Sequence, residues 1–134
     1  PRGAVILDLR HKDRPLRLVG VHLGLLRGNR RKQISYIADR LSNMPKCPTI
    51  IAGDFNEWRE RKGFETLPSW LRTHSPGASF PAGRPLLKLD KVAMTRDITV
   101  LDSEVIADPA AQIASDHRPI RARFQLDPVQ GAGR

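Results

Sequence analysis

Six polar residues stand where the sequence predicts that buried strands end or their loops begin. The apolar run 49–53 (TIIAG) stops at Asp54. The full set is His22, Asp54, Asn56, Asp90, Asp116 and His117. In a core, each of these groups would need a buried hydrogen-bonding partner. Together they suit a divalent cation, an activated water and an anionic transition state.

Each of these residues also has a simpler explanation when taken alone. A single strand histidine is more often satisfied inside a core than catalytic, Asp90 could cap a turn, and Asp54 could be the N-cap of a helix. Ligands nevertheless collect beyond strand ends in open α/β sheets, so the combination favours a site.

The segments around His22 predict a hairpin and a crossover. Residues 4–9 and 16–23 are expected strands joined by a polar turn, as in an antiparallel hairpin. Alternation along the second strand places His22 on one face with Leu16, Leu18 and Gly20. A helix over 28–43 follows, because apolar residues recur at Ile34, Ile37, Ala38 and Leu41. The strand 49–53 then completes a strand–helix–strand unit.

The rest of the chain predicts mostly strands and loops. The expected elements are a short helix at 63–67, a loop at 73–85, strands at 89–95 and 98–106, a loop at 108–115 and a strand at 119–126. The last strand alternates, with Ile120, Ala122, Phe124 and Leu126 on its inner face. Residues 127–134 are expected to be a disordered tail.

Composition limits the class of protein. The chain has 134 residues with 40% hydrophobic and 28% charged residues, which suits one globular domain. No apolar run approaches the roughly 18 residues of a membrane span, so we expect no transmembrane segment. Cys47 is the only cysteine, which is compatible with a reducing compartment, and we expect a cytoplasmic location. The net charge of +9 favours polyanionic partners, although a basic surface alone would give the same value.

Four motifs in order carry a resemblance to a known family. They are VGVHLGL (19–25), PTIIAGDFNE (48–57), LLKLDKV (86–92) and ASDHRPI (114–120). This order resembles the endonuclease/exonuclease/phosphatase superfamily, the Mg²⁺-dependent phosphoesterases related to DNase I. The loop 80–85 and the residues after it are similar to a bacterial branch of metal-dependent hydrolases. The resemblance implies an α/β (α+β) sandwich, with a mixed, mainly antiparallel sheet and outer helices.

The resemblance also implies roles for His22, Asp54 and Asn56. Asp54 would orient or deprotonate the attacking water, and Asn56 would donate its amide to a phosphate oxygen. His22 would lie at the phosphate and stabilise charge or protonate the leaving oxygen. In-line displacement of this kind needs cations around the equatorial oxygens.

The second half of the implied site contains Asp90, Asp116 and His117. Asp90 would hold a catalytic imidazole in one tautomer, Asp116 would bind metal or orient His117, and His117 would contact the scissile phosphate. The implied cofactor is Mg²⁺ or Mn²⁺, with Asp116, Asp54 and Asn56 as its ligands.

The motifs match only the C-terminal half of the four-layer superfamily fold, here residues 1–126. The N-terminal half brings a metal-binding Glu, and no Glu precedes His22 in this chain. We therefore expect a fragment, one chain of a cut protein, or a chain that self-associates through its inner sheet face. Activity of this chain alone is expected to be weak or absent.

The sequence leaves the substrate open. A cluster of basic residues, Arg27, Arg30, Arg31 and Lys32, would suit nucleic acid, and phospholipid headgroups are the second class. An inositol-phosphate 5-phosphatase is disfavoured, because PLLKLD replaces the tryptophan–cysteine stretch of that branch. The alternative function is a non-catalytic polyanion-binding or scaffold module that retains the fold.

Overall fold

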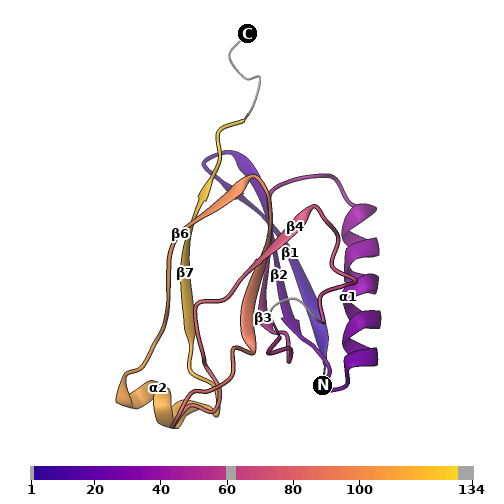
Figure 1. Ribbon diagram of the computed structural model, residues 1–134. Helices are drawn as coiled ribbons and strands as arrows, with labels where there is room; N and C mark the ends of the chain where they lie inside the picture. The colour runs from indigo at the N-terminus through magenta and orange to yellow at the C-terminus, as the bar shows by residue number, and fades with distance from the viewer. Residues whose placement is uncertain (1, 60–62, 130–134) are drawn as a thin grey trace.

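A five-stranded sheet lies between a helix and a two-stranded sheet (Figure 1). The computed structural model describes residues 2–59 and 63–129. The large sheet has the order β1-β2-β3-β5-β4, and the small sheet pairs β6 with β7. The strands are β1 Gly3–His11, β2 Arg14–His22, β3 Thr49–Asp54, β4 Leu71–His74, β5 Asp90–Thr95, β6 Ile98–Val105 and β7 Ile120–Leu126. The helices are α1 Arg27–Ser42 and α2 Pro109–Ala114.

The expected hairpin and crossover are confirmed. β1 pairs antiparallel with β2, and β2 pairs parallel with β3 after the crossover through α1. The remaining strand pairs are antiparallel, so the large sheet is mixed and mainly antiparallel, as the family resemblance implied.

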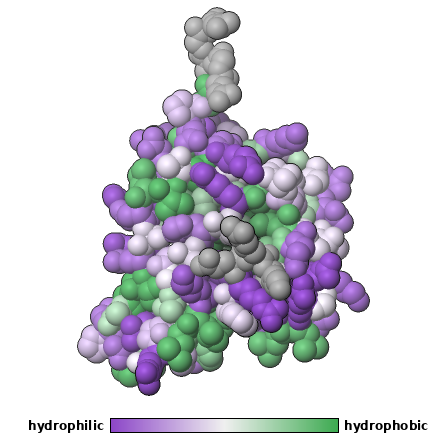
Figure 2. All heavy atoms as spheres, in the orientation of Figure 1, coloured by the Kyte–Doolittle hydropathy of each residue, from purple (hydrophilic) through white to green (hydrophobic). Residues whose placement is uncertain are grey.

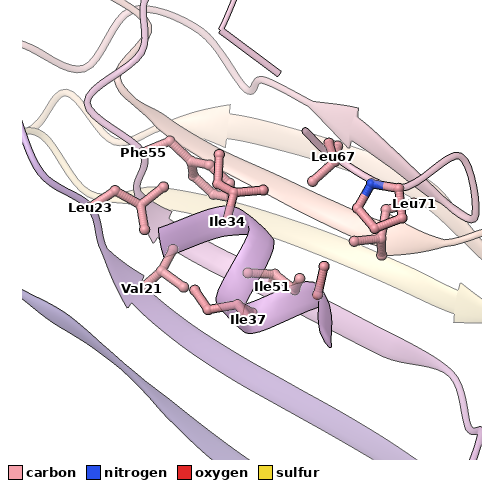
Figure 3. Close-up of a pocket in the computed structure, with 10 residues that line it drawn as sticks. Val21, Leu23, Ile34, Ile37, Ile51, Phe55, Leu67 and Leu71 are labelled. Atoms are coloured by element: carbon pink, nitrogen blue, oxygen red, sulfur yellow. The ribbon is translucent and has the colours of Figure 1, made fainter. Parts of the chain in front are cut away.

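The apolar stripe of α1 packs on one face of the large sheet (Figure 3). Ile34, Ala38 and Leu41 are buried in the helix. Ile34 and Leu41 join a cluster on the sheet and its loops that consists of Val19, Val21, Leu23, Ile51, Phe55, Leu71 and Ala93. A cavity of about 10 Å³ remains between them, which is room for no more than one water. This face is therefore core and not a ligand site.

The small sheet covers the opposite face of the large sheet. Its inner residues pack on a second cluster formed by Ile50, Val92, Met94 and Ile98. The alternation of β7 is confirmed, since Ile120, Ala122, Phe124 and Leu126 are each less exposed than the residues between them. The described chain is thus a sandwich of helix, sheet and sheet.

The cover on this second face stops before β1. Val5 pairs with Gly20 and Leu7 pairs with Leu18, so these side chains share the face of the second cluster. Val5 is nevertheless 73% exposed and Leu7 is 53% exposed. Part of the inner face is open, as expected for a chain that matches half of a larger sandwich.

The structure corrects three local expectations. The expected loop at 108–115 contains α2, because the Asp108 side chain accepts a hydrogen bond from the Ala111 N–H (2.7 Å) and Pro109 starts the helix. The expected helix at 63–67 is only a turn, closed by the Leu67 N–H on the Phe64 carbonyl (2.9 Å). The expected loop at 73–85 begins inside β4.

The expected disordered tail, residues 127–134, is fixed at its first residue. Asp127 is tied to the fold, because its N–H donates to the Asp97 carbonyl (2.8 Å) and its carboxylate accepts from Thr99 (2.8 Å). Residues 130–134 lie outside the described residues. In the described part of the chain, no helix is both long and apolar enough to cross a membrane.

Gly53 permits the close approach of β2 and β3 that the site requires. Its φ is 144°, and a Cβ atom there would lie 2.0 Å from the Val21 carbonyl oxygen. Any other residue would push the two strands apart or twist β3 just before Asp54.

We predict that Gly53→Ala lowers the free energy of unfolding by about 3 kcal/mol, because the substitution adds both a clash and an unfavourable φ. Urea denaturation measures the change. Gly20→Ala is the matched control, since a Cβ atom there meets nothing within 4 Å. The control should shift stability by less than about 0.5 kcal/mol. Equal stability of the two variants would contradict the account of Gly53.

Candidate active site

Three of the predicted site residues form a row across adjacent strands. His22 at the end of β2 pairs in register with Asp54 at the end of β3, and Asp54 pairs with Asp90 at the start of β5. Residues that pair directly across strands point to the same face. This is the face that the small sheet partly covers. The His22 Nε2 and Asp54 Oδ2 atoms are 3.5 Å apart.

His117 joins the row from the segment before β7. Its Nδ1 lies 2.7 Å from Asp90 Oδ2, and its Nε2 lies 3.7 Å from Asp54 Oδ2. The Phe80 ring packs on the imidazole, with the centroids 4.8 Å apart. The Ser79 hydroxyl donates to the same Asp90 oxygen. His117 is therefore fixed by a carboxylate on one side and an aromatic ring on another.

Two backbone hydrogen bonds hold the loop of His117 against the loop before β5. The Arg118 N–H donates to the Ser79 carbonyl (2.8 Å), and the Ala82 N–H donates to the Asp116 carbonyl (2.7 Å). These contacts join segments more than thirty residues apart at the end of the sheet where the row lies.

A tight turn orients Asp54 and Asn56. One carboxylate oxygen of Asp54, Oδ1, accepts the Asn56 N–H (2.8 Å), which leaves Oδ2 toward the imidazoles. Asn56 has a left-handed backbone (φ 50°), a conformation that Asn tolerates better than most residues. Its side-chain amide donates to the Leu23 carbonyl (2.7 Å) and so ties the β3 turn to the end of β2.

The structure does not bring Asp116 into the row. Asp116 is exposed, and the hydroxyl of Ser115 is 3.4 Å from its carboxylate. Among the described residues, the group with ligand atoms within 4.8 Å of one another is Asp54, Asp90 and His117. Two carboxylates near an open face fit a hard divalent cation, because Mg²⁺ usually binds through one or two carboxylates and keeps several waters.

No sequence pattern predicts several of the contacts at the site. Ser79 is fully buried against Asp90, yet a serine in a loop rich in Gly and Pro carries no distinctive spacing. Phe80 lies in the expected loop 73–85, where nothing in its spacing distinguishes it. The guanidinium of Arg2 lies against His22 Nε2. The two residues are twenty positions apart in the sequence, and no local pattern predicts that they are in contact.

Arg30 requires a correction. The sequence grouped it with Arg27, Arg31 and Lys32 as an exposed cation, and those three are exposed. Arg30 is buried instead, with Nη2 2.8 Å from Glu57 Oε2 and Nη1 3.3 Å from the Gly24 carbonyl. It therefore links α1 to both loops that leave β2 and β3, and it is not a surface contact for polyanions.

A larger hollow lies elsewhere on the described chain. It measures about 460 Å³ and is lined by residues near the start of β2, including Asp8, Arg17 and Cys47. Asp8 and Arg17 already pair there at 2.6 Å. The row of His22, Asp54 and Asp90 is at the other end of the same strands, with the His22 side chain half exposed and the two carboxylates only slightly exposed.

The pKa of His117 is raised above its ordinary value of 6.5. Burial lowers this pKa, but the hydrogen bond and charge of Asp90, with further charge from Asp54 and Asp116, outweigh the burial. Protonated His117 therefore stabilises the fold. That contribution is complete at pH below about 6.5 and is lost as the pH rises through the folded-state pKa.

We predict that NMR titration of His117 in EDTA gives a pKa above 6.5, and that Asp90→Asn lowers it, because the variant loses the charge that opposes burial. Asp116→Asn is the control and should lower the pKa less, since Asp116 is exposed. An unchanged His117 pKa in the Asp90→Asn variant would show that the contact with Asp90 does not raise that pKa.

We also predict that Arg30→Met and Glu57→Gln each lower the free energy of unfolding by about 3 kcal/mol, because each leaves a buried group of the other residue without its partner. The double variant should lose less than the two single losses together. Chemical denaturation of the four proteins measures this coupling. Additive losses would show that the pair is not an energetic unit.

Comparisons with known proteins agree with the motifs. Residues 5–117 match the endonuclease/exonuclease/phosphatase family. The uncharacterised protein YbhP of Escherichia coli K12 is 31% identical over 121 residues, covering 79% of this chain and 45% of YbhP. This chain thus spans about half the length of the curated relatives that it matches.

Solved structures show the same fold at low identity. A humanised TDP2 of D. rerio superposes with a TM-score of 0.76 at 19% identity, covering 92% of this chain and 61% of that one. A mannosyl-6-phosphatase of Bacteroides thetaiotaomicron gives 0.71 at 15% identity, with 86% and 53% covered. The DNase I-like fold and the recognition of its C-terminal half are thereby confirmed. This chain belongs to the endonuclease/exonuclease/phosphatase family.

Proposed function

We propose that the protein containing this chain hydrolyses phosphate esters by metal-assisted, in-line attack of water. The observation that carries the proposal is the position of Asp54 Oδ2 between two imidazoles, 3.5 Å from His22 and 3.7 Å from His117. A carboxylate between two imidazoles can act as a general base that accepts a proton from water, while a protonated imidazole on the other side contacts the phosphate.

Each residue of the row has a proposed part in the reaction. Asp54 orients the attacking water and accepts its proton. Asp90 accepts the Nδ1–H of His117, so that Nε2 is the nitrogen directed to the substrate. His117 and His22 stabilise charge on the phosphate oxygens, and His22 donates a proton to the leaving oxygen. The backbone N–H of Asn56 holds the turn. Its side-chain amide donates one N–H to the Leu23 carbonyl and has a second N–H for a phosphate oxygen.

Mg²⁺ or Mn²⁺ is the proposed cofactor, held by Asp54 with Asp116 and Asn56. Bound there, the cation would supply positive charge to the phosphate oxygens. The support is the half-buried group of Asp54, Asp90 and His117, whose ligand atoms lie within 4.8 Å of one another; Asp116 and Asn56 are not members of this group. Asp116 is on an exposed loop next to His117, within the same end of the fold.

The complete site requires residues beyond those described. The chain spans 45% of YbhP, and no Glu precedes His22 to complete the metal ligands. We therefore propose that the open inner face beside Val5 and Leu7 receives the rest of a family domain. The 134-residue chain alone should have weak activity or none.

A binding module without catalysis is the second candidate, and the net charge of +9 favours it. Duplex DNA affinity that falls with salt, without turnover in Mg²⁺, would support this candidate. The geometry of Asp54 and the two imidazoles favours hydrolysis.

We predict that bis-p-nitrophenyl phosphate is hydrolysed in Mg²⁺ or Mn²⁺ by the chain extended at its N-terminus in its own reading frame, and much more slowly by the 134 residues. In the extended protein, Asp54→Asn should lower kcat by at least about 100-fold, because it removes the proton acceptor. Asp13→Asn, in the exposed β1–β2 turn, is the control. A folded Asp54→Asn variant with normal kcat would remove Asp54 from the mechanism.

A further inference from the structure

Every loop that borders the site exposes a large apolar side chain. Leu25 and Leu26 follow β2 and are each 69% exposed, and Trp58 follows β3 and is 54% exposed. Leu86 precedes β5 and is 68% exposed, while Ile113 in α2 is 88% exposed. We call these five residues the site rim. They are five of the eleven large hydrophobic residues that are exposed in the described chain.

The topology gathers these loops at one end of the molecule. β2 and β3 are parallel and end there, and antiparallel β5 begins there. The segment with α2 reaches the same end through the hydrogen bond between Ala82 and Asp116. Figure 1 places α2 and these loops at the lower end, and Figure 2 shows hydrophobic surface gathered there.

Positive charge surrounds this apolar surface. The loop segments 23–32, 55–59, 80–89 and 107–117 contain seven Lys and Arg residues and three Asp and Glu residues, and the flanking Asp54 and Asp90 add two carboxylates at the same end. Two of the ten loop charges, Arg30 and Glu57, pair with each other in the interior. Arg59 lies over the Trp58 ring at 5.0 Å, so one side chain of the rim carries its own cation.

The combination of apolar side chains and cations fits some classes of partner better than others. Another copy of this chain would meet like charge, because each copy carries +9. A nucleic acid would use the cations and Trp58 but would gain little from four exposed aliphatic side chains. An anionic lipid surface uses both, since interfacial binding combines buried apolar area with attraction to acidic headgroups.

We propose that the site rim docks on an anionic phospholipid surface, so that the open row of Asp54 faces the phosphates of the headgroups. The inference of a docking surface depends only on the exposed side chains and the charges around them. The further step, that a lipid phosphate ester is the substrate, rests on the proposed function. The same face that exposes the rim also exposes His22, whose side chain is 50% accessible.

The test is co-sedimentation of the 134-residue chain with vesicles in EDTA. We expect binding to vesicles of phosphatidylglycerol and phosphatidylcholine, at least about tenfold weaker binding to phosphatidylcholine alone, and weakening by salt. The double variant Leu25→Ser/Leu26→Ser should bind at least about tenfold more weakly, because it loses inserted apolar area. Ile113→Ser, in the separate element α2, should also bind more weakly.

Tyr36→Ser is the matched control, because Tyr36 is 73% exposed but lies within α1, outside the rim. Its binding should stay within about twofold of the unchanged chain. Failure to bind phosphatidylglycerol vesicles, or equal losses in the control and the rim variants, would overturn the proposal. The proposal would also be overturned if light scattering showed a dimer that the double Leu variant does not form. Binding to duplex DNA but not to vesicles would overturn it too.

This readout separates docking from hydrolysis. Binding is measured without metal and without turnover, so a chain that binds vesicles supports the docking surface even where the hydrolysis assay fails. Conversely, hydrolysis of a soluble ester without vesicle binding would leave the proposed function in place and reject the docking surface.

Discussion

The register of β2, β3 and β5 is the constraint on which the site depends. Side chains alternate across a sheet, so a shift of one residue in any of these strands would send His22, Asp54 or Asp90 to the face covered by α1. Gly53 allows β2 and β3 to approach at the critical point, and the buried clusters on both faces hold the register. His117 then needs only the contact with Asp90 to complete the row.

The same packing explains why the site is both ordered and open. The pair of Arg30 and Glu57 ties α1 to the loops of His22 and Asn56, so the loops are fixed from the helix side. From the other side, the small sheet covers β3 and β5 but leaves β1 exposed. A chain that spans about half of its relatives thus presents a formed row of polar groups beside an uncovered apolar face.

Much of this arrangement could be predicted from the sequence, because it follows from local patterns. Alternation placed His22 on the correct face, and the helical stripe and the apolar run before Asp54 gave the crossover. What failed depended on contacts distant in sequence. Arg30 has the sequence neighbours of a surface cation, and only the fold reveals Glu57 beside it. Ser79 and Arg2 reach the row through loop geometry, and α2 is too short for its periodicity to separate it from a loop.

The central claim is that the row of Asp54 is a divalent-cation and phosphoester site, and Mn²⁺ tests it most directly. The chain has four histidines, of which His22 and His117 flank Asp54, while His11 lies at the far end of β1. The account predicts that low Mn²⁺ broadens the NMR signals of His22 and His117 before that of His11, and that excess Mg²⁺ restores them. Uniform broadening of all four, or broadening of His11 first, would contradict it.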